Sequence, residues 1–420
     1  MDRPENLDYE LLACVIEHGQ QFLGKPPDLL QSLCEDLLKR GLPLARVHVT
    51  FIPRHPQLRV GLLKWIPNRP VSWGHISWPD ASVRSPVFRR NPLYLLREGH
   101  LEEVRTRLTD TNRVERFRLT RELAKDGMTD YFALAINSGL QAPNTIAFAT
   151  HQVGGFTEAD VDRLRTIAWA LQVHMQRDTW YTLSETVCQT YIGTRAGQKV
   201  LNGEIRRGQY SRINAVVWFC DMRGFSELSR LHADDVVFDA LHTFFDAVGS
   251  AIESNGGEIL KFIGDSVLAI FPYGGEEEAE AACKAAFDGA LGCLESLDRV
   301  NRARLRAGSE NLRCGIALHR GQVLYGNVGT ETRLDFTVMG QTVNLANRLE
   351  SLCGKMGEHL LVTDVVAEKL GARVTARGRY SVKGFGQPIS VSGLPPDKVF
   401  EASKAPAAIT APLFEFNEDL

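Results

Sequence analysis

The sequence predicts an α+β protein with two folded parts, because two patterns of apolar residues recur along it. In some segments apolar and polar residues alternate, as in half-buried strands. In others apolar residues recur every three or four positions, as in helices. The length of 420 residues suits two or three domains. We expect one domain over residues 1–177, a helical, glycine-containing connector over 178–211, a second domain over 212–396 and a mobile tail over 397–420.

Composition and charge exclude several classes of protein. Apolar residues make up 44% of the chain and charged residues 24%, which is ordinary for a soluble globular protein. The net charge of −3 gives no bulk attraction for nucleic acid or anionic membranes. The eight cysteines include no Cys-x-x-Cys pair, so we expect reduced, mostly buried thiols. Because we find neither a signal peptide nor a membrane span, we expect a cytoplasmic protein.

The N-terminal part shows helices, strands, a middle without clear pattern, more strands and a final long helix. Thr157 and Asp160 have the spacing of a capping box at the start of that final helix. The other expected helices are Leu7–Phe22 and Pro27–Lys39, and the expected strands are Ala45–Ile52, Gly61–Ile66, Asp130–Asn137 and Thr145–Thr150. This order resembles a GAF-like or PAS-like sensor domain. Two alternatives stay open, a pocket for an unidentified small ligand and a dimerisation domain without one.

The C-terminal part has a sharper pattern, with helices, single strands and two hairpins. The expected helices are Asp234–Ser254, Glu276–Val300, Thr342–Cys353 and Asp364–Leu370, and the single strands are Asn214–Cys220 and His359–Thr363. One expected hairpin joins Glu258–Ile263 to Val267–Phe271 around Gly264-Asp265. The other joins Leu312–Leu318 to Val323–Val328 around His319-Arg320-Gly321.

Two aspartates follow strands of this second part. Asp221 ends the first strand, and Asp265 lies in the turn of the first hairpin. If these strands are neighbours in one antiparallel sheet, both carboxylates lie at the same end, and such oxygen ligands suit Mg²⁺ or Mn²⁺. A lone aspartate after a strand is more often a turn former. After Asp221 the chain turns through Gly224 into a helix near Ser226, where backbone amides could hold a polyphosphate or Ser226 could act as N-cap.

Four motifs carry a resemblance to class III adenylyl and guanylyl cyclases. They are Phe219-x-Asp221-x-x-Gly224-Phe225-Ser226, Gly257-Glu258-x-x-Lys261-x-x-Gly264-Asp265, Phe336-Thr337-Val338-Met339-Gly340-x-Thr342-Val343-Asn344-x-Ala346-x-Arg348-Leu349-Glu350 and Val382-Lys383-Gly384. One motif alone would be weak evidence, whereas four in the family's order and spacing are not expected by chance. The resemblance implies a ferredoxin-like βαββαβ domain with a mainly antiparallel sheet.

The active sites of this family form at a head-to-tail dimer interface, where each site takes residues from both chains. The resemblance implies that Asp221 and Asp265 of one chain bind two Mg²⁺ or Mn²⁺ ions per site. Lys261 and Thr337 of the other chain then face the purine. Because both sets are present in one chain, we expect a symmetric homodimer with two complete sites.

The same resemblance assigns the remaining site residues. Asn344 and Arg348 orient the ribose and stabilise the transition state, and Lys383 neutralises the terminal phosphates. Phe225 and Ser226 contact the substrate at the turn that follows the first metal ligand. Each position has a simpler alternative when it is taken alone.

Those alternatives are ordinary surface roles. Arg348 could form a surface ion pair with the nearby Glu350, Asn344 could make a polar contact within its helix, and Lys383 could be a solvated charge. Within the matched motifs we favour the functional roles.

Substrate choice depends on Lys261 and Thr337. A lysine can donate to adenine N1, which is an acceptor, but it faces a donor at guanine N1. The Thr337 hydroxyl can accept from the adenine 6-amino group, so ATP is favoured. Threonine here is typical of a subclass that includes bicarbonate-responsive cyclases, which makes bicarbonate a candidate regulator. Gln341 stands where that subclass usually has Asp or Asn, and we expect it to tune activity.

We therefore expect an adenylate cyclase, a phosphorus–oxygen lyase, that converts ATP into 3′,5′-cyclic AMP and pyrophosphate. Regulation would come from the N-terminal domain, with the connector either coupling the two domains or acting as a plain linker. The alternatives are a guanylate cyclase and a catalytically silent nucleotide-binding regulator.

Overall fold

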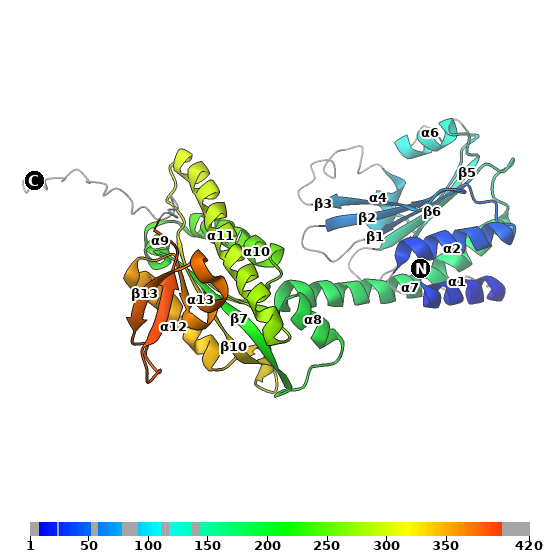
Figure 1. The fold of residues 1–420 in the computed structure, drawn as a ribbon. Helices are drawn as coiled ribbons and strands as arrows, with labels where there is room; N and C mark the ends of the chain where they lie inside the picture. The colour runs from blue at the N-terminus through cyan, green and yellow to red at the C-terminus, as the bar shows by residue number, and fades with distance from the viewer. Residues whose placement is uncertain are drawn as a thin grey trace, which may run out of the picture. The chain divides into compact units, whose positions relative to one another are not determined.

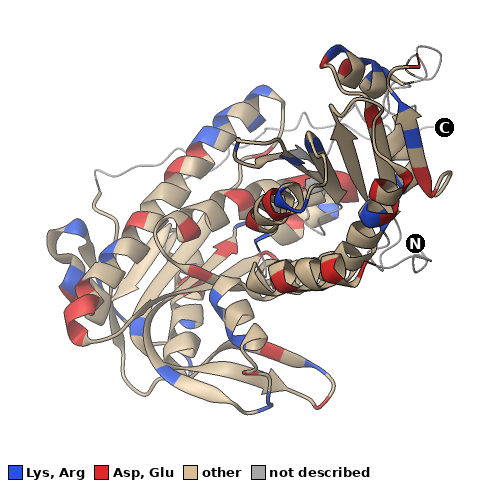
Figure 2. Ribbon diagram, turned by 90° about the vertical axis from the view of Figure 1, so that its right-hand side faces the viewer, with Lys and Arg blue, Asp and Glu red and all other residues tan. Residues whose placement is uncertain are grey.

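The computed structural model describes residues 8–22, 25–51, 58–77, 91–110, 114, 117–136 and 143–396. The chain divides into two compact units, Met1–Val187 and Cys188–Leu420 (Figure 1). The predicted mobile tail over 397–420 lies outside the described residues. Within them, no helix is both long and apolar enough to cross a membrane. Figure 2 shows acidic and basic residues interspersed along the helices, in keeping with the small net charge.

The N-terminal unit is built on an antiparallel sheet in the order β3-β2-β1-β6-β5-β4. The strands are β1 Arg46–Phe51, β2 Leu58–Trp65, β3 Ser72–Ser77, β4 Glu103–Arg107, β5 Asp130–Ile136 and β6 Asn144–Thr150. Helices α1 Tyr9–Gln21, α2 Pro26–Lys39 and α7 Glu158–Ile192 share an apolar core with one face of the sheet. Helix α4 Pro92–Arg97 contributes to a core on the other face, as does α6 Arg118–Lys125.

The elements expected in this unit are present, although the predicted ends at Leu7, Ile52 and Asn137 fall outside the described residues. The middle segment, which had no clear pattern, supplies the short elements β3, α4, β4 and α6. The predicted capping box is confirmed at the start of α7. The Thr157 amide donates to Asp160 at 2.9 Å, and the Asp160 amide donates to the Thr157 hydroxyl at 3.1 Å.

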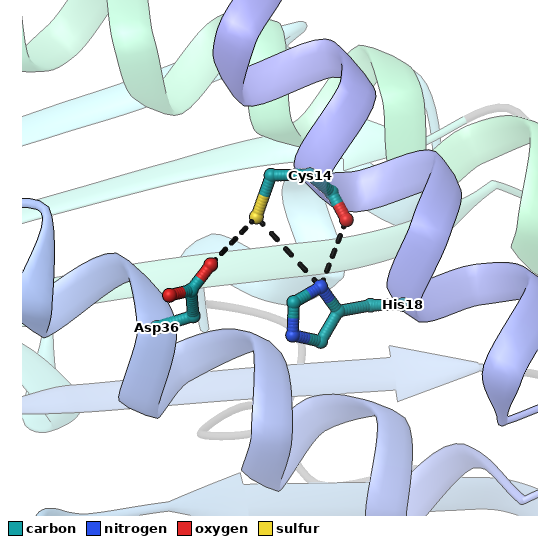
Figure 3. Close-up of side chains that lie close together, drawn as sticks. All are labelled: Cys14, His18 and Asp36. Atoms are coloured by element: carbon teal, nitrogen blue, oxygen red, sulfur yellow. Dashed lines mark hydrogen bonds between the residues drawn. The ribbon is translucent and has the colours of Figure 1, made fainter.

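A cluster of three polar side chains fastens α1 to α2 (Figure 3). The Cys14 thiol donates to Asp36 at 3.1 Å, and His18 Nδ1 donates to the Cys14 carbonyl at 2.8 Å. Burial raises the pKa of Cys14 to about 12, so the sulfur keeps its proton. The ligand atoms lie within 4.8 Å of one another, close enough for a metal. Because these hydrogen bonds and Arg40 already satisfy the groups, the cluster acts as a clamp between helices.

The connector contains a single break between two helices. Helix α7 continues into the connector as far as Ile192, and Gly193 with φ +100° separates it from α8 Thr194–Leu201. Gly197 lies inside α8, where a β-carbon would come within 2.8 Å of the Cys188 backbone. That glycine therefore permits close packing of α8 against the end of α7, and Gly193 supplies the joint.

The C-terminal unit has an eight-stranded sheet in the order β13-β14-β12-β10-β7-β9-β8, with β11 paired to β10. Its strands are β7 Tyr210–Met222, β8 Glu258–Ile263, β9 Ser266–Tyr273, β10 Cys314–Gly329, β11 Leu334–Met339, β12 Leu360–Thr363, β13 Thr375–Tyr380 and β14 Ile389–Gly393. Among these pairs, β10 and β12 run parallel and the others antiparallel. The sheet is thus mainly antiparallel, as expected, but mixed.

Helices cover both faces of this sheet. One core is shared with α9 Phe225–Leu231, α10 Asp234–Ser254, α11 Glu276–Arg306 and α13 Asp364–Leu370. The other is shared with α12 Gln341–Met356 and with α8. Trp218, buried on β7, stacks on Phe271 in the first core, and Phe219 faces the second. This alternation follows from the opposite directions of successive side chains along a strand.

The expected hairpin around His319-Arg320-Gly321 is wrong. These residues lie within the continuous strand β10, because β7 offers an uninterrupted partner in which Gly321 pairs with Ala215. Gly321 is extended here, and a β-carbon would come within 2.7 Å of the Thr342 hydroxyl. The glycine therefore serves close packing against α12 rather than a turn. Strand β11, within the third motif, was also not expected.

Helix α8 is fixed to the sheet by the buried carboxylate of Glu258. Its Oε1 accepts from the Ala196 amide at 3.0 Å and from the Tyr325 hydroxyl at 2.9 Å. Burial raises the pKa of Glu258 and also that of Tyr325. The two hydrogen bonds offset part of the cost of burying these polar groups.

Replacing Tyr325 with Phe should therefore loosen α8. We expect a loss of about 1–3 kcal/mol, because a buried carboxylate loses one of its donors. The readouts are the urea midpoint of the C-terminal unit and amide exchange at Ala196. Tyr210→Phe is the matched control, since that ring is 56% exposed and its loss should cost under about 0.5 kcal/mol. Equal amide exchange rates at Ala196 in the two variants would contradict the role of the Tyr325–Glu258 hydrogen bond in fixing α8.

Candidate active site

The two aspartates predicted to bind metal lie at adjacent strand ends. Asp221 on β7 pairs with Ser266 on β9, and Asp265 immediately precedes Ser266 in the turn from β8. The Ser266 hydroxyl donates to Asp221, and the Met222 amide donates to the Asp265 carbonyl at 3.4 Å. Antiparallel pairing therefore brings the two carboxylates to the same end of the sheet.

The electrostatics of this pair suit a cation. Burial raises the pKa of Asp265, and the negative charge of Asp221 raises it further. Two half-buried carboxylates that repel each other gain from sharing a positive charge. Their oxygens are the hard ligands that Mg²⁺ and Mn²⁺ prefer, so these residues fit the expected metals.

The chain turns after the metal pair through Gly224, whose φ of +79° is in the left-handed region that glycine adopts at little cost. Helix α9 begins at Phe225, one residue earlier than expected, and Phe225 packs against the core under α10 and α11. Ser226 is exposed in the first turn. The alternative in which Ser226 caps the helix is wrong, because Gly224 is the N-cap and no side chain makes a cap bond.

The two predicted purine-facing residues come together on β8 and β11. Lys261 on β8 forms an ion pair with Asp335 on β11. Asp335 and Thr337 are two residues apart, so they point to the same face of the strand. Thr337 is 7% exposed, and within the described chain its hydroxyl has no hydrogen-bond partner. An unpaired buried hydroxyl costs free energy, which a ligand that donates to it would recover.

Asn344 and Arg348 lie side by side on the exposed face of α12. They are one turn apart, and Gln341 precedes them on the same face. Glu350 is 6% exposed and lies about 200° around the helix from Arg348. Glu350 pairs with Arg223 instead, so the alternative of a surface pair between Arg348 and Glu350 is wrong.

Lys383 lies at the opposite edge of the sheet from Lys261. It is exposed in the turn after β13, where the Phe385 amide donates to the Val382 carbonyl at 3.1 Å. Strand β13 ends one side of the strand order and β8 the other. Within one chain, therefore, the predicted residues form separate groups at β7–β9, β8–β11, α12 and the β13 turn.

An ion pair beside the two metal-binding aspartates was not expected from the sequence. Arg223 follows Asp221 by two residues, and its Nη2 lies 3.6 Å from Glu350 Oε1. Burial raises the pKa of Glu350 to about 7, while the charge of Arg223 lowers it. Glu350 stood in the third motif, but its partner is 127 positions away, so no local pattern could have revealed the pair.

Comparison with known proteins identifies this arrangement. The family described as the adenylate and guanylate cyclase catalytic domain matches residues 206–392. Those residues form a class III cyclase catalytic domain. The resemblance found in the four motifs is thereby confirmed at the level of the domain. The GAF-like or PAS-like nature of the N-terminal unit stays a prediction.

The chain is similar to several adenylate cyclases over about half of its length. An adenylate cyclase of Anabaena cylindrica is 30% identical over 233 residues, covering 53% of this chain and 45% of that protein. Adenylate cyclase 1 of Rhizobium meliloti is 30% identical over 178 residues, covering 42% of this chain and 26% of the other. The chain thus spans less than half of either relative.

Solved cyclase structures are also similar to part of this chain. The adenylyl cyclase CyaB from P. aeruginosa is 28% identical, with a TM-score of 0.41, and covers 44% of this chain and 96% of that one. The guanylyl cyclase Cya2 is 27% identical, with a TM-score of 0.38, and the alignment covers 46% of this chain and 98% of that one.

The unpaired hydroxyl of Thr337 yields a prediction about the cyclase domain without nucleotide. Thr337→Val keeps the shape and removes the unpaired group, so stability should rise by about 1–3 kcal/mol in urea unfolding. Thr342→Val is the matched control, because that hydroxyl donates to the Gln322 carbonyl at 2.8 Å. The control should lose about 1 kcal/mol. Destabilisation by both changes would show that Thr337 already has a partner.

Proposed function

We propose that this chain is an adenylate cyclase that works as a symmetric homodimer and converts ATP into cyclic AMP and pyrophosphate. The observation that carries the proposal is the direction of α12. Its buried face, with Glu350, turns toward the strand end that bears Asp221, while Asn344 and Arg348 face outward. These two side chains are thus positioned for the metal pair of a second chain rather than their own.

In this proposal each residue group has one task. Asp221 and Asp265 hold Mg²⁺ or Mn²⁺, which when bound would activate the ribose 3′-oxygen and neutralise phosphate charge. Arg348 of the second chain stabilises negative charge on the α-phosphate, and Asn344 orients the ribose. Lys383 neutralises the terminal phosphates.

The choice of ATP over GTP depends on the purine-facing residues. Asp335 holds the ammonium group of Lys261, which can donate to adenine N1. The unpaired hydroxyl of Thr337 can accept from the adenine 6-amino group. Guanine presents a donor at N1, which faces the Lys261 donor, whereas its O6 carbonyl can accept from the Thr337 hydroxyl. Discrimination against GTP therefore depends mainly on Lys261. The adenylate cyclase relatives support this choice, while a guanylate cyclase is the alternative.

The N-terminal unit is proposed to regulate the cyclase domain. It contains an apolar cavity of about 100 Å³ lined by α2, β1, β2 and α7, with Leu29, Val49, Leu63 and Met175 among its walls. This cavity favours the alternative of a small, largely apolar ligand over a domain without one. Stimulation by bicarbonate stays a prediction that rests on Thr337 alone.

Substrate and metal requirements can be measured on the purified full chain. We expect cyclic AMP from ATP with Mg²⁺ or Mn²⁺. The kcat/KM for GTP should be lower by a factor of roughly ten or more, since the Lys261 ammonium group faces a donor at guanine N1. Asp221→Ala and Asp265→Ala should abolish the product. A preference for GTP would reverse the purine argument. If the folded dimer makes no product when metal is supplied, the remaining alternative is a catalytically silent nucleotide-binding regulator.

A mixture of two inactive variants tests the shared site. Asp265→Ala chains lack one metal ligand, and Arg348→Ala chains lack the transition-state arginine. Each variant alone should be inactive, but a mixed dimer has one site with both groups intact. We expect activity to return to at most about half that of the wild-type dimer, per mixed dimer formed. Absence of recovery in a dimer shown to exchange chains would rule out shared sites.

A further inference from the structure

The buried contact between Arg223 and Glu350 joins two parts of the cyclase domain that have different tasks. Arg223 lies two residues after Asp221, at the end of β7. Glu350 lies two residues after Arg348, on α12. The side chain of Glu350 is 8% exposed and that of Arg223 is 24% exposed, with 3.6 Å between Nη2 and Oε1. The pair thus connects the metal-binding strand end to the helix that carries the outward-facing arginine.

Two glycines make room for this contact. A β-carbon at Gly315, which pairs with Asp221 across the sheet, would come within 2.0 Å of Arg223 Nη2. A β-carbon at Gly354, one turn beyond Glu350 on α12, would come within 2.1 Å of Arg223 Nη1. The guanidinium group therefore occupies a slot between strand and helix. The Arg223 amide also donates to the Arg313 carbonyl at 2.8 Å, which fixes the base of the side chain.

We propose that the contact between Arg223 and Glu350 is a positioning link between the two active centres of the dimer. The inference rests on the proposed shared sites. In such a dimer, Asp221 of one chain serves one centre, and Arg348 of the same chain serves the other. The link sets the distance between Asp221 and Arg348 within each chain. A change at one centre is therefore passed through α12 to the other.

The first test removes the link without removing a charge. Gly354→Ala pushes the guanidinium group out of its slot, while alanine is favoured over glycine in a helix by about 1 kcal/mol. We expect kcat to fall by roughly tenfold or more and KM for ATP to change less, with the dimer still folded. Glu350→Gln should lower kcat similarly, and Arg223→Lys should retain part of it. Lys284→Met, which breaks an exposed pair with Glu280, is the control.

The decisive test places Gly354→Ala in one chain of a mixed dimer. The parent mixture combines Asp265→Ala chains with Arg348→Ala chains, so the single working centre takes its metal ligands from the second and its arginine from the first. Gly354→Ala is then introduced into either chain. We expect kcat to fall by roughly tenfold or more with both placements. The Mg²⁺ concentration for half-maximal activity should rise only when the change is in the chain that supplies the metal ligands.

Each of the other possible outcomes would contradict the proposed link. If only one placement lowers the activity, the contact positions either the metal ligands or the arginine, but not both. Unchanged kcat in both would remove any role beyond packing. An inactive parent mixture would instead overturn the shared-site dimer and, with it, the basis of the link. The parent mixture thus separates failure of the proposed function from failure of the inference.

Discussion

The hydrogen bonding of β7 to β10 on one side and β9 on the other determines most of the C-terminal unit. The pairing with β10 runs from Tyr210–Gly326 to Met222–Cys314, and it keeps β10 straight through a segment that resembles a turn. The pairing with β9 sets Asp221 opposite Ser266, and hence beside Asp265. A shift of the strand register by one residue would turn every side chain of the strand to the opposite face of the sheet. The pairing of β7 therefore also determines which side chains contact α12.

Local signals in the sequence were sufficient for elements with strong periodicity and for residues close in the chain. Helices α10 and α13 have the bounds expected from their patterns, and Asp265 lies in the expected β8–β9 turn. The sequence misled where a distant partner decides the structure. Gly321 has the composition of a turn but is extended, because β7 pairs with it. The pairing of Arg223 with Glu350 was missed for the same reason.

The candidate site also contains groups that do not satisfy one another within a single chain. The Thr337 hydroxyl is buried without a partner, Asp265 repels Asp221, and Glu350 Oε1 lies beyond hydrogen-bond distance of Arg223. Most buried polar groups in proteins are paired, so such exceptions concentrate where a ligand or a second chain completes the structure. By contrast, the Cys14 thiol and the Oε1 atom of Glu258 have hydrogen-bond partners within the chain.

The slot for Arg223 has a consequence for how this domain can change during evolution. A side chain larger than hydrogen at Gly315 or Gly354 displaces the guanidinium group, and a shorter residue in place of Arg223 leaves Glu350 buried without its cation. Leaving a buried charge unpaired is strongly destabilising. No one of these four positions is therefore free to drift alone. In descendants of this sequence they should be inherited, or exchanged, as a set.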